Sequence, residues 1–310
     1  MNSICVKAPA TTANLGPGFD CLGMALDLWN TLEVTPGEVI PDAPLPGDGH
    51  LVEITGHGAG ELAADSSNLI YRSMRFLFQE AGQELPSLSL RCHNEIPLAR
   101  GLGSSAAAIA GGLVAANALS GGVFAAKELL EMAATIEGHP DNVAAAVLGG
   151  LQLVLSDERQ LYTAPIATPP ELQLVLFIPE VRIATEDARA VLPSHISVAD
   201  AVHNTSRIAL LVAGMATNHP EYLRLATEDR LHQPYRQPLF PAMKVIFAAA
   251  RDAGALGVFL SGSGSTVLAL TQGREMTVAY EMAEAARQAN VAGEVKITKP
   301  TMQGAHLVEC

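Results

Sequence analysis

Residues 97–107 read PLARGLGSSAA, and a long run of small apolar residues follows them. Glycines at 101 and 103 allow the backbone to turn closely around a bulky anion. Ser104 and Ser105 stand where a helix would begin, and the free amides and dipole of a helix N-terminus favour negative charge. The stretch therefore predicts a phosphate-binding loop that leads into a buried helix. Taken alone, the same residues also fit an ordinary Gly/Ser turn.

The spacing within this loop excludes the two commonest nucleotide-binding motifs. The Lys of G-x-x-x-x-G-K-[ST] is missing, and the glycines do not have the spacing of G-x-G-x-x-G. If the loop binds phosphates, it belongs to another class of nucleotide-binding protein.

The composition indicates a soluble protein that does not bind nucleic acid. Of 310 residues, 49% are hydrophobic and 16% are charged, which is enough apolar material for two domains. The net charge is −13 and aromatic residues are only 5%, whereas nucleic-acid binding needs a basic face or stacking rings. The N-terminus does not resemble a signal peptide, and the apolar stretch 102–119 contains Ser, Gly and Asn, so we expect no membrane span and a cytoplasmic location.

The four cysteines stand at positions 5, 21, 92 and 310. No two of them have the C-x-x-C spacing of a zinc or redox site. We therefore expect four free thiols in a reducing compartment.

Helical and strand patterns are mixed along the chain. Apolar residues at helical spacing predict helices at 67–81, 125–138 and 275–289, and alternation predicts strands at 4–10, 87–96 and 172–179. Because the two kinds do not alternate strictly, an α+β architecture is favoured over a doubly wound sheet. The pattern breaks near 156–172, which predicts domains at 1–160 and 161–310. The Pro- and Gly-rich region 36–50 is expected to be a loop.

Three further segments carry polar groups that could serve a site. Glu131, followed by EGHPDN at 137–142, offers the hard oxygen ligands that Mg²⁺ prefers. NLGPGFD at 14–20 offers an amide and a carboxylate on a turn, and SGSGST at 261–266 is a second small-residue loop. Taken singly, each is explained equally well by a helix cap, a solvated acid, a polar turn or a tight strand connection.

Together, these segments resemble the three motifs of the GHMP kinases (galacto-, homoserine, mevalonate and phosphomevalonate kinases). The matching stretches are PATTANLGPGFDCLGMAL at 9–26, PLARGLGSSAA at 97–107 and LSGSGSTVLAL at 260–270. Within the superfamily, the chain is most similar to homoserine kinases, on NLGPGFDCLGMAL at 14–26, EGHPDNV at 137–143, HNTSR at 203–207 and PYR at 234–236. The resemblance implies a two-domain fold, with an N-terminal domain like ribosomal protein S5 domain 2 and a ferredoxin-like C-terminal domain.

The resemblance also implies which residues bind ATP, Mg²⁺ and substrate. The nucleotide would contact Asn68 and the loop residues Pro97, Arg100, Gly101, Leu102, Gly103, Ser104, Ser105, Ala106 and Ala107. The metal would be held by Ser104 or Ser105 with Glu131. The substrate would contact Asn14, Asp20, His139, Thr185, Arg189 and Arg236, beside the catalytic residues Asp141 and Asn142. Thr185 and Arg189 are one helical turn apart, so they can face one pocket, and arginine pairs well with a carboxylate.

The implied reaction is ATP-dependent phosphorylation of the hydroxyl of L-homoserine, a step toward threonine, by a homodimer. The transition state of phosphoryl transfer is loose, so positioning of the reactants and stabilisation of charge supply most of the catalysis. Asp141 could act as a general base, or it could only orient the substrate with Asn142, and we favour orientation. The alternatives are a kinase for mevalonate, a sugar or shikimate, and a non-catalytic regulator on the same fold. The presence of Glu131 and both loop serines argues against the regulator.

Overall fold

The first two strands form a long antiparallel ladder. In the computed structural model, which describes residues 3–37, 51–157 and 160–310, β1 (Ile4–Asn14) pairs with β2 (Gly18–Pro36). The register shifts after Pro9 and after Ala13, and the turn expected at 14–20 shrinks to three residues between the strands. From residue 38 on, the predicted loop at 36–50 lies outside the described residues.

This ladder is the centre of a larger sheet. β4 (Leu88–Asn94) pairs with β2, and β3 (Leu51–Gly56) runs parallel to β4. A branch leaves the other end of β2, where β5 (Leu151–Asp157) pairs with it and β6 (Gln160–Ile166) pairs with β5. The predicted division after residue 160 therefore falls inside β6, which belongs to the first sheet.

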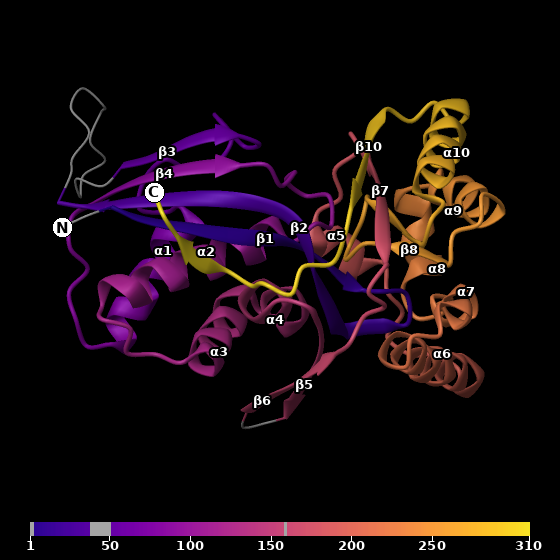
Figure 1. Cartoon of the computed structure of the whole chain (residues 1–310), viewed down its shortest axis with the longest axis horizontal. Helices are drawn as coiled ribbons and strands as arrows, with labels where there is room; N and C mark the ends of the chain where they lie inside the picture. Colours follow the sequence, from indigo (N-terminus) through magenta and orange to yellow (C-terminus); the bar gives the residue numbers. More distant parts are fainter. Residues whose placement is uncertain (1–2, 38–50, 158–159) are drawn as a thin grey trace.

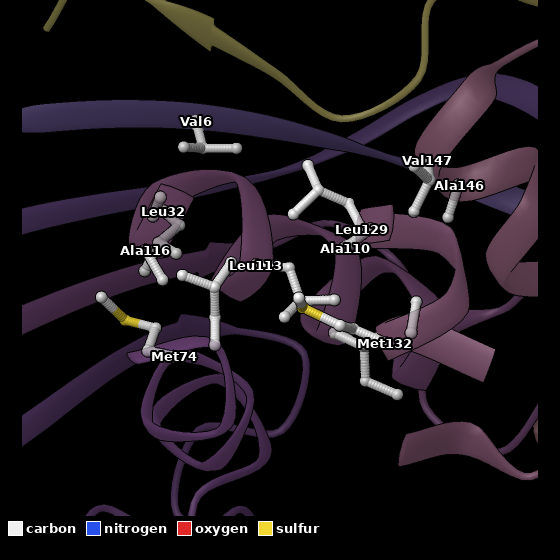
Figure 2. Packing of buried hydrophobic residues seen from close by; sticks show 14 of the residues in the cluster. Val6, Leu32, Met74, Ala110, Leu113, Ala116, Leu129, Met132, Ala146 and Val147 are labelled. Carbon is white, nitrogen blue, oxygen red and sulfur yellow. The ribbon is translucent and has the colours of Figure 1, made fainter. Parts of the chain in front are cut away.

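Four helices lie on one side of this sheet (Figure 1): α1 (Leu69–Glu80), α2 (Ser104–Leu119), α3 (Ala126–Glu137) and α4 (Pro140–Leu148). Figure 2 shows that side chains from these helices and from β1 and β2 meet in one core, among them Val6, Leu32, Met74, Leu113, Leu129 and Ala146. Gly112 lets α2 lie against α1, because a Cβ there would be 2.8 Å from the carbonyl oxygen of Ile70. Because its buried residues are small, α2 packs closely against its neighbours, and this packing fixes the position of its first turn.

The second half of the chain forms a four-stranded antiparallel sheet in the order β10-β7-β9-β8. Its strands are β7 (Gln173–Pro179), β8 (Gly257–Leu260), β9 (Val267–Thr271) and β10 (Gly293–Thr298). Its helices are α5 (Thr185–Ala190), α6 (Val198–Ala216), α7 (Leu223–Ala226), α8 (Gln233–Arg236), α9 (Met243–Asp252) and α10 (Glu275–Gln288), with short 3-10 turns η1 (Pro220–Tyr222) and η2 (Gln237–Leu239). This order, with the last strand beside the first, is the ferredoxin-like arrangement, so the predicted α+β fold is confirmed. No described helix is long and apolar enough to cross a membrane.

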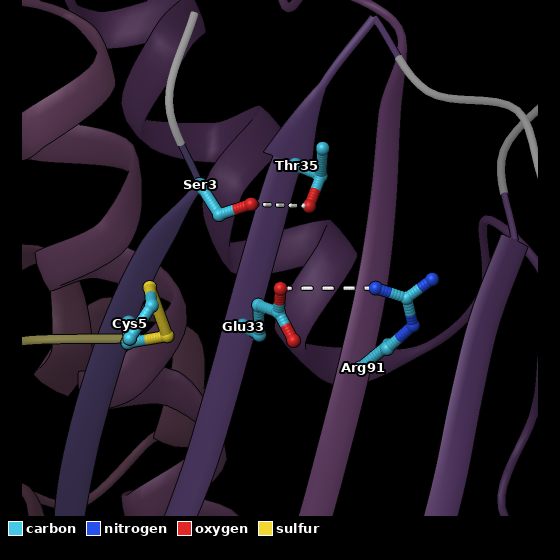
Figure 3. The surroundings of a disulfide bond; sticks show 6 residues. Ser3, Cys5, Glu33, Thr35 and Arg91 are labelled. Carbon is cyan, nitrogen blue, oxygen red and sulfur yellow. Dashed lines mark hydrogen bonds and ion pairs between the residues drawn. A yellow bond between two sulfur atoms is a disulfide. The ribbon is translucent and has the colours of Figure 1, made fainter.

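The end of the chain returns to the first domain (Figure 1). β11 (His306–Val308) pairs antiparallel with β1, and a disulfide joins Cys5 to Cys310 (Figure 3). The prediction of four free thiols is therefore wrong for this pair, whereas Cys21 and Cys92 are free. The error has a simple cause, since spacing along the sequence does not reveal two cysteines that antiparallel pairing brings together.

Reduction of this disulfide is expected to lower the free energy of unfolding by about 2–5 kcal/mol, because the bond closes a loop of nearly the whole chain and restricts the unfolded state. Guanidinium unfolding with and without dithiothreitol measures the difference. Cys310→Ser should show the same loss and no further response to reductant. If reductant leaves the midpoint of the unmodified protein unchanged, the bond does not form in solution.

Candidate active site

A cavity of about 510 Å³ lies between the two domains and gathers most of the predicted site residues. Those that line it are Asn14, Asp20, Asn68, Pro97, Arg100, Gly101, Leu102, Gly103, Ser104, Ser105, His139, Asp141, Asn142, Thr185, Arg189 and Arg236. Ala106 and Ala107 are buried in α2 behind the loop and do not line it. The three motifs, far apart in sequence, therefore meet around one space.

The predicted phosphate loop is held tightly against its neighbours. Gly101 and Gly103 have φ values of 73° and 65°, which disfavour residues with a Cβ. A Cβ at Gly103 would lie 1.8 Å from Oγ1 of Thr11, and one at Gly101 would lie 2.0 Å from the carbonyl oxygen of Ser261. Gly103 precedes α2 without a side-chain cap, so the first amides of this helix remain available to an anion.

Arg100 braces this loop against the second domain. Its Nε and Nη2 donate to the carbonyl oxygens of Pro179 and Glu180, each at 2.6 Å, and its Nη1 donates to that of Leu98 at 3.1 Å. The family resemblance implied that Arg100 contacts the nucleotide, but its guanidinium donates hydrogen bonds to three backbone carbonyl oxygens. It lines the cavity while fixing the position of the loop.

Of the two glutamates Glu131 and Glu137 on α3, only Glu137 lines the cavity. The Glu131 side chain is 44% exposed, lies 3.9 Å from Lys127 in an ion pair and is not part of the cavity wall. The expectation that it turns inward is wrong. Glu137 ends α3, is 11% exposed, and its Oε1 accepts a hydrogen bond of 2.5 Å from Oγ of Ser105.

Ser105 and Glu137 together present hydroxyl and carboxylate oxygens, the donors that suit Mg²⁺. Among the described residues, no group of three or more acidic, His or Cys side chains could hold a metal by itself. This fits the habit of Mg²⁺, which commonly takes one or two protein ligands and completes its coordination with phosphate oxygens and water.

A second group of polar residues lies at the start of α4. The Asp141 carboxylate is buried. Its Oδ1 accepts hydrogen bonds from the backbone amide of Asn142 at 2.8 Å and from Nδ1 of His139 at 3.1 Å. This hydrogen bond raises the pKa of His139, although burial opposes the shift. Oδ1 of Asn142 accepts from Oγ1 of Thr11 at 2.7 Å, which ties α4 to β1 beside the phosphate loop.

Two arginines stand at the same end of the cavity. Arg189 binds both oxygens of Asp20, at 2.8 and 3.0 Å, and Thr185 lines the cavity on the same helix, as predicted. Arg236 is buried and donates to the carbonyl oxygens of Ala188 and Gly262, and burial lowers its pKa to about 10. Within the described part of the chain, its Nη2 has no hydrogen-bond partner, so it can still bind an anion in the cavity.

Two of the three predicted asparagines, Asn14 and Asn68, make hydrogen bonds within the protein. Asn14 donates to Gly262 and accepts from the Asp20 amide, so it links the first loop to the third and positions Asp20. Asn68 caps α1 by accepting from the Ile70 amide, and its Nδ2 donates to the carbonyl of Ala63. Both asparagines shape the wall of the cavity through bonds within the protein.

Known proteins are similar to this chain in both sequence and architecture. The family models described as GHMP kinases N terminal domain and GHMP kinases C terminal match residues 68–150 and 206–292. A homoserine kinase of Moorella thermoacetica is 45% identical over 98% of this chain and 99% of its own length. The chain belongs to the homoserine kinase family of the GHMP kinases. A Synechocystis homoserine kinase is 42% identical over 95% of this chain and 94% of its own length.

Solved structures of the homoserine kinase family agree with the fold. The homoserine kinase from Cytophaga hutchinsonii has a TM-score of 0.87 and 31% identity, covering 99% of this chain and 98% of that one. A mevalonate kinase from L. major, at 16% identity over 95% of each chain, has a TM-score of 0.69 and shares the fold alone. The homoserine kinase family, like other GHMP kinases, uses ATP as its phosphoryl donor.

Three residues that line or support the cavity stand out among those that the sequence did not assign to the site. Glu137 and Gly262 line the cavity, and Thr11 holds Asn142 beside Gly103. Glu137 is the first residue of the EGHPDN stretch, which was itself singled out, so the signal was present. Gly262 lies in the SGSGST stretch, which was also singled out. Thr11 acts through its contact with Asn142, and a single sequence gives no direct signal for a contact between distant segments.

Proposed function

We propose that this protein transfers the γ-phosphoryl group of ATP to the hydroxyl of L-homoserine, forming O-phospho-L-homoserine for threonine synthesis. The observation that carries the proposal is the meeting, in one cavity, of the uncapped start of α2 with Asp20, Arg189 and Arg236. The first can bind a polyphosphate, and the three side chains suit the ammonium and carboxylate groups of an amino acid. The named relatives support the same substrate.

The polyphosphate of ATP would lie along the amides around Gly103 and the first turn of α2. We propose that Ser105 and Glu137 hold Mg²⁺ there, and when bound this ion would neutralise charge that develops on the phosphoryl oxygens. The brace formed by Arg100 keeps the loop amides aimed at the same point. Such preorganised donors stabilise the transition state because they need not reorient during the reaction.

The substrate amino acid would be oriented from the opposite side. Nη2 of Arg236 and the guanidinium of Arg189 would bind the carboxylate, and Asp20 would accept from the ammonium group. Asn142 lies beside Gly103, and Asp141 precedes it in the first turn of α4, so these two side chains would orient the hydroxyl. The arrangement accounts for selection of a zwitterionic alcohol over mevalonate, a sugar or shikimate.

Release of ADP with L-homoserine, with and without Mg²⁺, tests the proposed function. Turnover should depend on the metal and should be far lower with mevalonate, galactose or shikimate. Turnover with one of these alcohols in place of homoserine would leave the fold assignment intact and overturn the substrate. A protein that binds ATP but phosphorylates none of them would fit the regulator instead.

Asp141→Asn is expected to raise the KM for homoserine and to retain kcat within about one order of magnitude. The carboxylate already accepts hydrogen bonds from the backbone amide of Asn142 and from His139, which hold it in place and suit it to orienting the substrate. Steady-state kinetics with each substrate varied in turn measure both constants. A loss of about three orders of magnitude in kcat would instead identify Asp141 as the general base.

We also propose a cytoplasmic location and a homodimer. Location is supported by the use of ATP, and the homodimer rests on the resemblance to the family. Cell fractionation and light scattering of the purified protein test these two proposals. Disulfides are uncommon in the cytoplasm, so thiol trapping in the same cells would report whether the Cys5–Cys310 bond is closed there.

A further inference from the structure

A short segment between β3 and α1 forms part of the cavity wall. Leu62 and Ala63 line the cavity, and the carbonyl oxygen of Ala63 accepts a hydrogen bond of 2.7 Å from Nδ2 of Asn68. The segment is tied to the sheet near its ends, where the His57 amide donates to the carbonyl of Asn94 and the Val52 amide donates to that of Ala64. Between these ties lies Glu61, whose side chain is 49% exposed.

Glu61 makes a two-pronged contact with the other domain. Nη2 of Arg182 donates to its Oε1 at 2.8 Å, and Nη1 donates to its Oε2. Arg182 lies 121 residues further along the chain, just after β7. The contact lowers the pKa of Glu61 and raises that of Arg182, so both groups are charged at neutral pH.

Arg182 is presented from a segment that is itself firmly attached to the phosphate loop. Arg100 binds the carbonyls of Pro179 and Glu180, and the Ile183 amide donates to the carbonyl of Ala99. Oγ of Ser265, in the third loop, donates to the carbonyl of Val181. The Arg182 side of the ion pair is therefore fixed relative to the phosphate-binding end of the cavity.

Beside this ion pair the two domains are not packed together. A groove of about 460 Å³ is lined by Glu61, Arg182, Arg100 and Glu180, and it shares Pro97, Leu98 and Arg100 with the main cavity. The ion pair thus spans an open interdomain groove at the margin of the proposed nucleotide site. Tight apolar packing does not explain why the segment around Glu61 keeps its position.

We propose that Glu61 and Arg182 form a latch that holds the 57–64 segment against bound nucleotide. The inference rests on the proposed function only in that ATP occupies this cavity. Both are positioning residues that act through Leu62 and Ala63, which line the cavity, and neither takes part in phosphoryl transfer. If the ion pair breaks, the 57–64 segment can move away from the bound nucleotide, which then dissociates faster. The phosphoryl-transfer step itself would not change.

Glu61→Gln and Arg182→Gln are each expected to raise the KM for ATP and the dissociation constant of a non-hydrolysable ATP analogue about 3- to 5-fold, the size of an exposed ion pair. The KM for homoserine and kcat should stay unchanged. The double variant should lose no more than either single variant, because both remove the same interaction. The charge-reversed pair, Glu61→Arg with Arg182→Glu, should recover most of the loss. Arg287→Gln, which breaks the similar exposed pair with Glu284 on α10, is the matched control and should change nothing.

Because Glu61 and Arg182 have opposite charges, their single variants distinguish the latch from direct electrostatic attraction of the nucleotide by Arg182. If Arg182 only attracted the anionic nucleotide, Arg182→Gln would weaken binding while Glu61→Gln would strengthen it, and that result would overturn the latch. Unchanged nucleotide binding in both single variants would overturn it as well. The proposed function fails separately, if the unmodified protein neither binds the ATP analogue nor phosphorylates homoserine.

Discussion

Replacement of Glu137 by alanine is expected to lower kcat/KM for homoserine phosphorylation by about 10²–10³-fold. The variant removes the carboxylate that accepts from Oγ of Ser105 at the start of α2, where charge on the transferring phosphoryl group must be stabilised. ADP release at saturating homoserine, measured across a range of Mg²⁺ concentrations, should show a weaker dependence on the metal. Glu137→Asp should recover part of the activity, because it restores the charge at a shorter reach.

Glu131→Ala is the matched control for this experiment. Glu131 lies on the same helix and carries the same charge, but it is exposed and paired with Lys127. Its removal should change kcat/KM by no more than about two-fold, as is usual for surface substitutions. If Glu131→Ala were severely impaired and Glu137→Ala were not, the assignment drawn from the cavity would be wrong.

Gly103→Ala is expected to reduce kcat/KM by about 10²-fold or more while the protein still folds. The added Cβ would lie 1.8 Å from Oγ1 of Thr11, so the loop or β1 must shift at the point where the proposed phosphate site begins. Displacement of catalytic groups by about 1 Å is enough for a loss of this size. Kinetics and circular dichroism on the same sample measure activity and folding together.

Gly122→Ala separates backbone strain from misplacement of the loop. Its φ of 72° is close to that of Gly103, but no atom lies within 4 Å of a Cβ built there. Both variants therefore have a similar conformational cost, which is about 1 kcal/mol for alanine in the left-handed region of backbone dihedral angles. Only Gly103→Ala should lose activity. Equal losses in the two variants would show that general destabilisation accounts for both.

The motifs predicted many of the residues that line the cavity because they depend on local chemistry. A glycine-rich turn before a helix, a carboxylate at a helix start and an arginine one turn beyond a threonine all depend on neighbouring residues. Thr185 and Arg189 face one cavity for this reason. The two-domain α+β fold followed from the same motifs through their resemblance to a family.

The choice between Glu131 and Glu137 could not be made in this way. Six residues on a helix of 3.6 residues per turn place the two side chains about 120° apart around the axis, so only one can face the cavity. The sequence does not state how α3 is rotated against α2. That rotation is set by the packing of Leu129, Leu130 and Met132 in the core.

Long-range pairing accounts for the other omissions. β6 is exposed along most of its length and shows no alternation, and β11 has only three residues, so neither produces a recognisable pattern. The disulfide joins positions 305 residues apart. Each of these features exists because two segments meet in space, and the residues involved carry no local signal of their partner.

The return of β11 to β1 has a consequence for how the protein is made. During synthesis, the edge of β1 that receives β11 must wait until residues 306–308 have left the ribosome. An unpaired strand edge is a template for association with other chains, so translation that stalls before residues 306–308 should yield aggregation-prone products. The sheet that contains β1 is therefore completed only after the second domain has been synthesised.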